Sequence, residues 1–563
     1  MSYVVNIARK QKTISSSLWA AYGDILGFPT ELASPGMVRQ RLGSASSTRS
    51  TPWRRLVGGR FGAQVDLCSG AYSDDTQLRL ATSRSIGPDG FFDVESFAKV
   101  ELPIWLSYSL GAGRGSKAAA NALIDRSSNW FSNFYATNGL EYVHGGGNGA
   151  AMRIQPHVWA ARNLADERTI LASVIRNAIS THGHIRGIAG AMVHAIALAR
   201  IFRHEKLPSP NEWIGFADVI RTIPKLVAMD SELSAFWLPT WEKLSGIDIG
   251  LATARVADEW SACVTDASPH LFGGPIEAYT RVVKELSGLT DNERGSGLKS
   301  ALFSLVACWV FREAGPKECI ETIANYLGSD TDTIGTMAGA LFGALPNQVA
   351  PGDTIQDRDY LEAEAVRLFE VSHGGSSTDR FPYPDLLYWQ APKTALDCVS
   401  GTSGNYELAG FGGLSALSEE FGAAQKGTVW QWFQLDFGQT IVCKRRSLPK
   451  SLARTNSKVT ASKQMKADES LSMMDERAQT VSPLVGNDLF SITKSHAPSK
   501  GVDTDVSFSL DQLTDSVIRS NFEPSAIGQA MLRICSEENA IELSLAFSAI
   551  IVKARRARMR KGL

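Results

Sequence analysis

The sequence predicts an all-α domain followed by a small mixed α/β subdomain and a helical C-terminal segment. Apolar residues recur at three- and four-residue steps through most of residues 18–345, where strand-like alternation is scarce. The composition changes after about residue 353 and again after residue 444. At 563 residues the chain exceeds the ~250–300 residues at which a single core usually stops growing, so we expect at least two domains.

The helical pattern is clearest in eight segments of the first region. Pro103 and Pro224 fall inside two of them and would kink or break those helices. We assign residues 1–352 to this domain. The expected helices cover residues 94–106, 118–124, 166–179, 188–202, 211–229, 276–286, 298–312 and 334–345.

Three further regions follow. Residues 353–443 are expected to form the mixed subdomain, with a strand pair at residues 430–442. Residues 444–505 are rich in Ser, Lys and Thr, which is typical of a flexible linker. Residues 506–563 should hold helices at 510–522, 525–535 and 540–554, and they end in a basic run at 553–561.

Charge and cysteine content exclude several classes of protein. With 57 basic and 58 acidic residues, no global field would attract nucleic acid or an anionic membrane. No apolar stretch reaches the ~20 residues of a membrane span, and residues 1–27 lack the apolar core of a signal peptide. The seven cysteines are scattered and never spaced C-x-x-C, which argues against a disulfide framework or zinc cluster. We expect a cytoplasmic protein without a membrane partner.

Two acidic clusters stand at predicted helix starts: Ser73-Asp74-Asp75-Thr76 and Asp330-Thr331-Asp332-Thr333. Asp, Ser and Thr are good N-caps, so each cluster alone could simply cap its helix. Adjacent carboxylates repel each other, however, unless they are solvated or hold a cation. Oxygen donors without Cys or His suit hard divalent metals such as Mg²⁺ rather than zinc.

Five segments, in order along the chain, carry a family resemblance. They resemble the signature segments of the ADP-ribosylglycohydrolase family, which includes the dinitrogenase reductase-activating glycohydrolase, over about residues 18–345. The five segments are Gly23-Asp24-Ile-Leu-Gly-Phe-Pro-Thr-Glu31, Ser73-Asp-Asp-Thr76, Gly147-Asn148-Gly149-Ala-Ala-Met-Arg153, Thr181-His182, and Leu327-Gly-Ser-Asp330-Thr-Asp332-Thr333-Ile-Gly-Thr-Met-Ala-Gly339.

The resemblance implies an all-α fold with two Mg²⁺ ions in a cleft, Mn²⁺ being an alternative. Glu31 and Asp75 would be the catalytic residues, and Glu31 is the first choice for the group that accepts the proton of the attacking water. A cluster aspartate or the water activated by the metal could replace it in that role. The family more often has Thr at the position of Ser73, but the hydroxyl is retained. The implied metal ligands are Glu31, Ser73, Asp74, Asp75, Asp330, Asp332 and Thr333.

The remaining loops are expected to bind ADP-ribose. Gly145, Gly146 and Gly147, just before Asn148 and Gly149, could turn backbone N–H groups toward the diphosphate, and the turn that ends at Gly115 could clamp it. A histidine at a helix entry more often caps or packs, but the resemblance favours His182 as an ADP-ribose contact. We expect His184 to be a capping or packed residue.

Together these features predict a hydrolase that removes ADP-ribose from a modified acceptor, with an arginine-linked protein as the favoured substrate. Two alternatives stay open. One is a module that binds ADP-ribose without cleaving it. The other is a hydrolase acting on an ADP-ribosylated nucleic acid or small molecule, with the basic C-terminal run as the point of nucleic-acid contact. That run could equally be a solvated helix end that complements the helix dipole.

Overall fold

A computed structural model describes residues 2–137, 139–375, 379–402, 404–447, 509–537 and 540–560. The chain divides into two compact units, Met1–Ser447 and Leu448–Leu563. Most of the expected linker, from residue 448 onward, lies outside the described residues; its first three residues belong to a strand that ends at Arg446.

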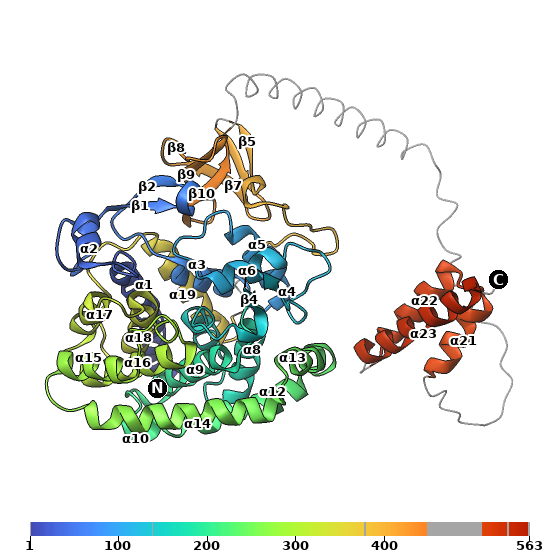
Figure 1. Ribbon diagram of the computed structural model, residues 1–563, viewed down its shortest axis with the longest axis horizontal. Coiled ribbons are helices and arrows are strands. Elements are labelled where there is room, and N and C mark those ends of the chain that lie inside the picture. Colours follow the sequence, from blue (N-terminus) through green and yellow to red (C-terminus); the bar gives the residue numbers. More distant parts are fainter. Residues whose placement is uncertain are drawn as a thin grey trace. The chain divides into compact units, whose positions relative to one another are not determined.

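The first unit is a helical body with small β elements (Figure 1). The all-α class predicted for its main part is confirmed. Its helices are α1 (Ser2–Gly27), α2 (Pro35–Leu42), α3 (Asp74–Arg84), α4 (Val94–Ser96), α5 (Leu102–Trp105), α6 (Arg114–Ala122), α7 (Gln155–Trp159), α8 (Glu167–Ile179), α9 (Ile185–His204), α10 (Pro210–Trp213), α11 (Phe216–Arg221), α12 (Ile223–Met229), α13 (Leu238–Ser245), α14 (Ile249–Ala267), α15 (Pro275–Glu285), α16 (Gly297–Val310), α17 (Pro316–Asn325), α18 (Thr331–Gly343) and α19 (Arg358–Ser372).

Helices α1 and α18 form the most intimate contact of the body. A Cβ placed on Gly339 would lie 2.1 Å from the carbonyl oxygen of Trp19, and one on Gly23 would lie 2.1 Å from that of Gly335. Glycine therefore lets the two backbones touch. The contacts run antiparallel, so the C-terminal end of α1 meets the N-terminal end of α18. The Gly23-Asp24 segment is the last turn of this long helix rather than a loop between helices.

Helix α9 has the length and hydropathy of a membrane span, but 89% of its apolar window is buried inside the protein. Helix α9 is therefore a core helix that packs against α8 and α16. A Cβ on Gly190 of α9 would lie 2.1 Å from the carbonyl oxygen of Gly297, the first residue of α16. This close approach ties the start of α16 to the centre of the fold.

The β elements of the first unit form three sheets, of which the smallest pairs β3 (Ala136–Thr137) with β4 (Leu140–Glu141). A hairpin of β1 (Trp53–Val57) and β2 (Ala63–Leu67) was not predicted; its apolar alternation is interrupted by Arg54 and Arg55. The expected strand pair at 430–442 is the hairpin of β9 and β10, which extends an antiparallel sheet. The sheet runs β10 (Thr440–Arg446), β9 (Thr428–Leu435), β7 (Gly412–Ala416), β6 (Asn405–Leu408) and β5 (Val399–Thr402), with β8 (Phe421–Gly422) also on β9.

The sheet and α19 share the hydrophobic core of the helical body. Leu368 of α19 and Phe433 of β9 are fully buried in the same cluster as residues of α1 and α9. Trp432 of β9 donates a hydrogen bond of 2.9 Å to the carbonyl oxygen of Asp66 in β2. Residues 353–447 thus pack on the first 352 residues within one unit.

Most of the expected helices are present, with shifted ends. The expected helix at 211–229 is three short helices, α10 to α12, and Pro224 stands in the first turn of α12. The expected helix at 94–106 contains a π-helical turn at Phe97–Glu101 just before Pro103. Over the described residues 509–537 and 540–560 of the second unit, α21 (Leu510–Arg519), α22 (Pro524–Ile534) and α23 (Ala540–Arg560) pack around a small apolar core.

Candidate metal centre and substrate cleft

The packing of α1 on α18 brings the two acidic clusters together. Asp24, in the last turn of α1, is fully buried and holds the start of α3. Its carboxylate accepts hydrogen bonds from the backbone N–H of Ser73 (2.9 Å) and from both the N–H (3.0 Å) and the hydroxyl (2.6 Å) of Thr76. Asp24 therefore positions the first cluster, a role that the sequence did not reveal.

A direct hydrogen bond joins the two clusters. The hydroxyl of Thr333 donates to Asp75 Oδ1 over 3.2 Å, although 258 residues separate them in sequence. Ser73 caps α3 by accepting from the N–H of Asp75, and Asp332 accepts from the N–H of Thr333. Capping and convergence therefore coexist, and the capping alternative alone does not explain the site.

The carboxylates of the site raise one another's pKa. Burial is the main cause for Asp74, Asp75 and Asp332, whose pKa values are well above the ordinary value. Neighbouring carboxylates add to the effect: Glu31 acts on both Asp74 and Asp332, and Asp74 on Asp75. Burial likewise raises the pKa of Glu31 to about 7, opposed by Arg55 and reinforced by Asp330 and Asp24. So many buried carboxylates can be ionised together only when a cation compensates them.

The donor set fits a hard divalent cation. Asp75 Oδ2 is buried without a hydrogen-bond partner, so it has a free acceptor. Carboxylate and hydroxyl oxygens are the donors that Mg²⁺ prefers. Among the residues the structure describes, no three Asp, Glu, His or Cys side chains surround one point closely enough to hold an ion alone. Mg²⁺ commonly keeps several waters and needs only one or two carboxylates, so this arrangement remains compatible with it.

Asn148 connects the glycine-rich loop to the second cluster. Its side-chain amide donates to Asp330 Oδ2 and to the hydroxyl of Ser300, each over 3.0 Å. Its backbone N–H donates to the carbonyl oxygen of Gly295, just before α16. The close packing of α9 on α16 thus fixes the loop against Asp330.

The predicted ADP-ribose residues also lie together. A Cβ on Gly149 would lie 3.0 Å from the ring of His182, and one on Gly145 would lie 3.4 Å from the hydroxyl of Tyr135. A Cβ on Gly115 would lie 3.5 Å from the same hydroxyl. The structure therefore brings the start of α6, the glycine-rich loop and the Thr181-His182 turn to one place.

The backbone of the glycine-rich loop differs from the phosphate-binding expectation. The N–H groups of Gly145 and Gly146 donate to the carbonyl oxygens of Tyr142 and His144, each over 3.0 Å, because the loop folds back on itself. These two N–H groups are therefore occupied. A Cβ on Gly297 would lie 2.9 Å from the carbonyl oxygen of Gly147. Close packing of this loop on α16 is a second reason for its glycines.

A buried arginine holds the binding loops, and the sequence did not single it out for a role. Arg153 donates to the carbonyl oxygen of Gly149 (3.0 Å), to the hydroxyl of Thr181 (2.8 Å) and to Asn177 Oδ1 (2.7 Å). Thr181 in turn lies 2.7 Å from His182 Nδ1. Burial, and secondarily Arg153, lower the pKa of His182 to about 3, so this histidine is neutral. His184 caps α9, as expected, by accepting from the N–H of Arg186.

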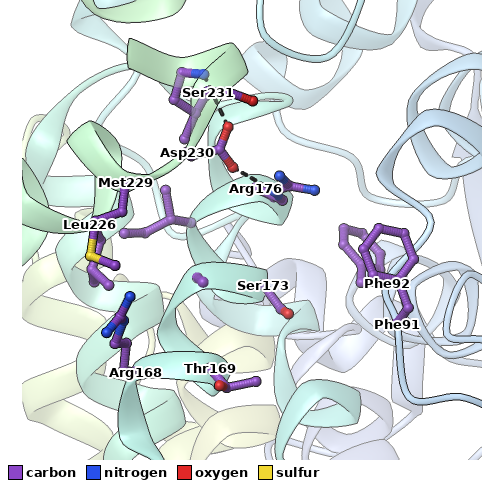
Figure 2. Close-up of a pocket in the computed structure, with 13 residues that line it drawn as sticks. Phe91, Phe92, Arg168, Thr169, Ser173, Arg176, Leu226, Met229, Asp230 and Ser231 are labelled. Carbon is purple, nitrogen blue, oxygen red and sulfur yellow. Dashed lines mark hydrogen bonds and ion pairs between the residues drawn. The ribbon is translucent and has the colours of Figure 1, made fainter. Parts of the chain in front are cut away.

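Another cavity, of about 460 Å³, lies beside α8 and carries no predicted site residue. Figure 2 shows Arg176 and Asp230 joined by an ion pair of 2.6 Å, with Phe91 and Phe92 farther along the cavity. Asp230 also accepts from the backbone N–H of Leu233. Arg176 and Asp230 therefore pair with groups of the protein itself, and none of the site residues predicted from the sequence lines this cavity.

Comparison with known proteins identifies similar chains. An ADP-ribosyl-[dinitrogen reductase] glycohydrolase of Rhodospirillum rubrum is 27% identical over 190 residues, which cover 32% of this chain and 57% of that protein. This chain thus matches a little over half the length of that relative. Uncharacterized proteins of Archaeoglobus fulgidus and Escherichia coli (YegU) are 24% and 25% identical, covering 64% and 60% of this chain and 97% and 88% of their own lengths.

A solved structure of an ADP-ribosylglycohydrolase-related protein complex covers 65% of this chain and 99% of its own, with 22% identity and a TM-score of 0.39. The sequence profile of the ADP-ribosylglycohydrolase family matches residues 7–376, about two thirds of the chain. The resemblance noted in five segments is confirmed, and the chain belongs to the ADP-ribosylglycohydrolase family, a family of glycosidic-bond hydrolases.

Proposed function

We propose that the protein removes ADP-ribose from a modified acceptor by hydrolysis that depends on two Mg²⁺ ions, which Mn²⁺ could replace. The observation that carries the proposal is the convergence of both acidic clusters with Glu31 in a chain of this family. Glu31, Ser73, Asp74, Asp75, Asp330, Asp332 and Thr333 would hold the ions. When bound, the ions would orient the ribose hydroxyls and lower the pKa of the attacking water.

The residues of the chain then have distinct tasks. Glu31 would accept a proton from the water as its oxygen bonds to the anomeric carbon and the glycosidic bond breaks, and the proton would pass on to the leaving acceptor. Asn148 and His182 would contact ADP-ribose. Asp24 and Arg153 position these groups through the hydrogen bonds described above. Substrate binding remote from the reacting carbon would align that carbon.

We favour an arginine-linked protein as the substrate. A protein acceptor is named for the Rhodospirillum rubrum relative, and the preference for this linkage is an analogy with the family.

All seven cysteines are free thiols, which supports a reducing cytoplasmic location.

Release of ADP-ribose from arginine-linked and serine-linked proteins and from an ADP-ribosylated nucleic acid, with Mg²⁺, Mn²⁺ or EDTA, tests the proposal. We expect release from at least the arginine-linked substrate that stops in EDTA and returns with Mg²⁺. Release that persists in EDTA would remove the metal from the reaction. ADP-ribose binding without release from either substrate would make the protein a binding module. Release only from modified nucleic acid would exclude a protein acceptor.

A further inference from the structure

The segment between Glu31 and Asp66 is unusually rich in arginine. Residues 32–65 contain six arginines and no acidic residue. The segment forms α2 and most of the hairpin of β1 and β2, which lie along the chain between Glu31 and Ser73. In Figure 1 the hairpin of β1 and β2, in blue, lies beside the sheet of the first unit. A segment whose charged side chains are all basic thus lies next to the candidate active site.

These elements enclose a groove of about 1000 Å³, here called the arginine groove. Its charged lining residues are Arg41, Arg54, Arg55 and Asp66. Asp66 pairs with Arg54 over 2.6 Å at the exposed surface, so the lining keeps a net charge of two positive units. Gln40, Trp53 and Gln64 also line the groove.

Aromatic rings fix two of the guanidinium groups. Arg55 lies 4.4 Å above the ring of Phe28, and Arg41 lies 5.3 Å above the ring of Trp53. Arg55 Nη1 is buried without a hydrogen-bond partner. Burial and the neighbouring Arg55 both lower the pKa of Arg41. Held rigidly and close to each other, these cations are ready for an anion to pair with them.

One residue of the groove also contacts the proposed catalytic carboxylate. Arg55 Nη2 lies 3.8 Å from Glu31 Oε2, and Arg41 donates a hydrogen bond of 2.7 Å to the carbonyl oxygen of Pro29. Arg55 therefore belongs both to the groove and to the surroundings of the proposed catalytic carboxylate. Because Arg55 contacts Glu31, an acceptor chain held beside Glu31 would lie within reach of the arginine groove.

We propose that the arginine groove binds an acidic stretch of the ADP-ribosylated protein next to the modified side chain. This inference rests on the proposed function and adds the class of acceptor. Guanidinium groups bind carboxylates through paired hydrogen bonds, and Gln40 and Gln64 offer further donors on the exposed rim. Nucleic-acid strands are usually held by bases stacked on open aromatic faces. Trp53, the aromatic residue of the lining, is 6% exposed and has Arg41 and Arg55 over its ring.

The test compares three substrates that carry the linkage the enzyme cleaves: a small ADP-ribosylated amino acid, a peptide flanked by Asp and Glu, and the same peptide with Asn and Gln. The double variant Gln40→Glu/Gln64→Glu changes no arginine and cancels the net charge of the groove. We expect kcat/KM on the acidic peptide to fall roughly tenfold at low salt, and less at high salt because surface charges are screened. Turnover of the small substrate should stay at the wild-type rate.

The variant Gln11→Glu makes the same isosteric change on the exposed face of α1 and serves as the control. Equal kcat/KM for acidic and neutral peptides, or equal losses on all three substrates, would overturn the proposal. Stronger inhibition by a single-stranded oligonucleotide than by the unmodified acidic peptide would assign the groove to nucleic acid instead. If no substrate is cleaved, the proposed function fails. Calorimetry then measures the affinity of wild type and variant for the acidic peptide, which tests the groove independently of catalysis.

Discussion

At the scale of single residues, Asp75 is where the two halves of the site meet. Its Oδ1 accepts from Thr333, its Oδ2 has no partner, and its pKa is raised by burial and by Asp24 and Asp74. Removing the charge while keeping the shape should separate two effects. The metal should lose a ligand, and the metal-free protein should lose a repulsion.

We therefore expect Asp75→Asn and Asp332→Asn to abolish Mg²⁺ binding and turnover while the helical circular dichroism stays near wild type. Without metal, each variant should melt at or above the wild-type temperature, because a buried like-charge interaction is gone. Calorimetry and thermal unfolding with and without Mg²⁺ measure both effects, with Asp218→Asn on the exposed face of α11 as the control. Unchanged metal affinity in both variants would contradict the two-cluster site.

Glu31 offers a second test at this scale, because its side chain reaches the same centre from the turn after α1. Glu31→Gln keeps nearly the same shape but cannot accept a proton, so turnover should fall by roughly 10²–10⁴-fold. ADP-ribose affinity should stay close to wild type, since Glu31 is not assigned to that contact. Single-turnover rates and ADP-ribose calorimetry on the same samples are the measurement. If the variant turns over at the wild-type rate, Glu31 is not the base, and a cluster aspartate or the activated water has that role.

At the scale of elements, the glycines of α1 and α18 decide whether the acidic clusters meet. Gly339→Ala should place a methyl group 2.1 Å from the carbonyl oxygen of Trp19 and force the helices apart. We expect a loss of about 1–3 kcal/mol in the free energy of unfolding, typical of overpacking, together with weaker Mg²⁺ binding. Gly36→Ala in α2 is the control, since the nearest atom to its Cβ is 3.9 Å away. Denaturant melts showing equal stability for the two variants would show that this contact does not position the clusters.

Buried histidines of the helices give a pH-dependent test. Burial, and then Arg79, lower the pKa of His194 in α9 to about 3, below the ordinary value of about 6.5. Below about pH 6.5 the His194 side chain becomes protonated in the unfolded chain but stays neutral in the folded chain. The contribution of neutral His194 to stability is therefore complete above pH 6.5 and is lost as the pH falls toward 3. His194→Gln should flatten the slope of unfolding free energy between pH 6 and 4 by about one proton, or ~1.4 kcal/mol per pH unit.

Urea titrations of wild type and His194→Gln at several pH values measure this slope. His204→Gln is the control, because His204 is exposed at the end of the same helix. Equal slopes for wild type and His194→Gln would mean that His194 is protonated in the folded protein.

The elements also show what sequence reasoning could and could not reach. Helices such as α9 and α16 were predicted because their apolar residues recur at helical spacing. The hairpin of β1 and β2 was missed because Arg54 and Arg55 interrupt its alternation, and tertiary packing of Trp53 and Val65 decides its structure. Asp24 lay within a recognised segment, but its role depends on a hydrogen bond to Ser73, 49 residues away. Arg55 could not be placed near Glu31 without the fold.

At the scale of the whole molecule, the division of the chain after Ser447 indicates which part of the chain is needed for catalysis. The match to the family ends at residue 376, whereas the sheet up to Arg446 shares the core of the helical body. The proposed centre and the arginine groove use residues 24–333. The unit Leu448–Leu563 has its own small core in α21, α22 and α23. Catalysis on a small substrate should therefore need residues 1–447 and nothing beyond them.

We accordingly expect a chain shortened to residues 1–447 to stay folded and to hydrolyse a small ADP-ribosylated substrate at the full-length rate. A chain shortened to residues 1–376 should aggregate or melt at a lower temperature, because it would lose buried residues such as Phe433 and Ile441 from the core. Activity assays, circular dichroism and thermal melts on the three lengths give the answer. If residues 1–447 fold but are inactive on the small substrate, the C-terminal helices are part of the catalytic unit. If residues 1–376 match the full-length chain in both stability and rate, the sheet is a separable addition rather than part of the core.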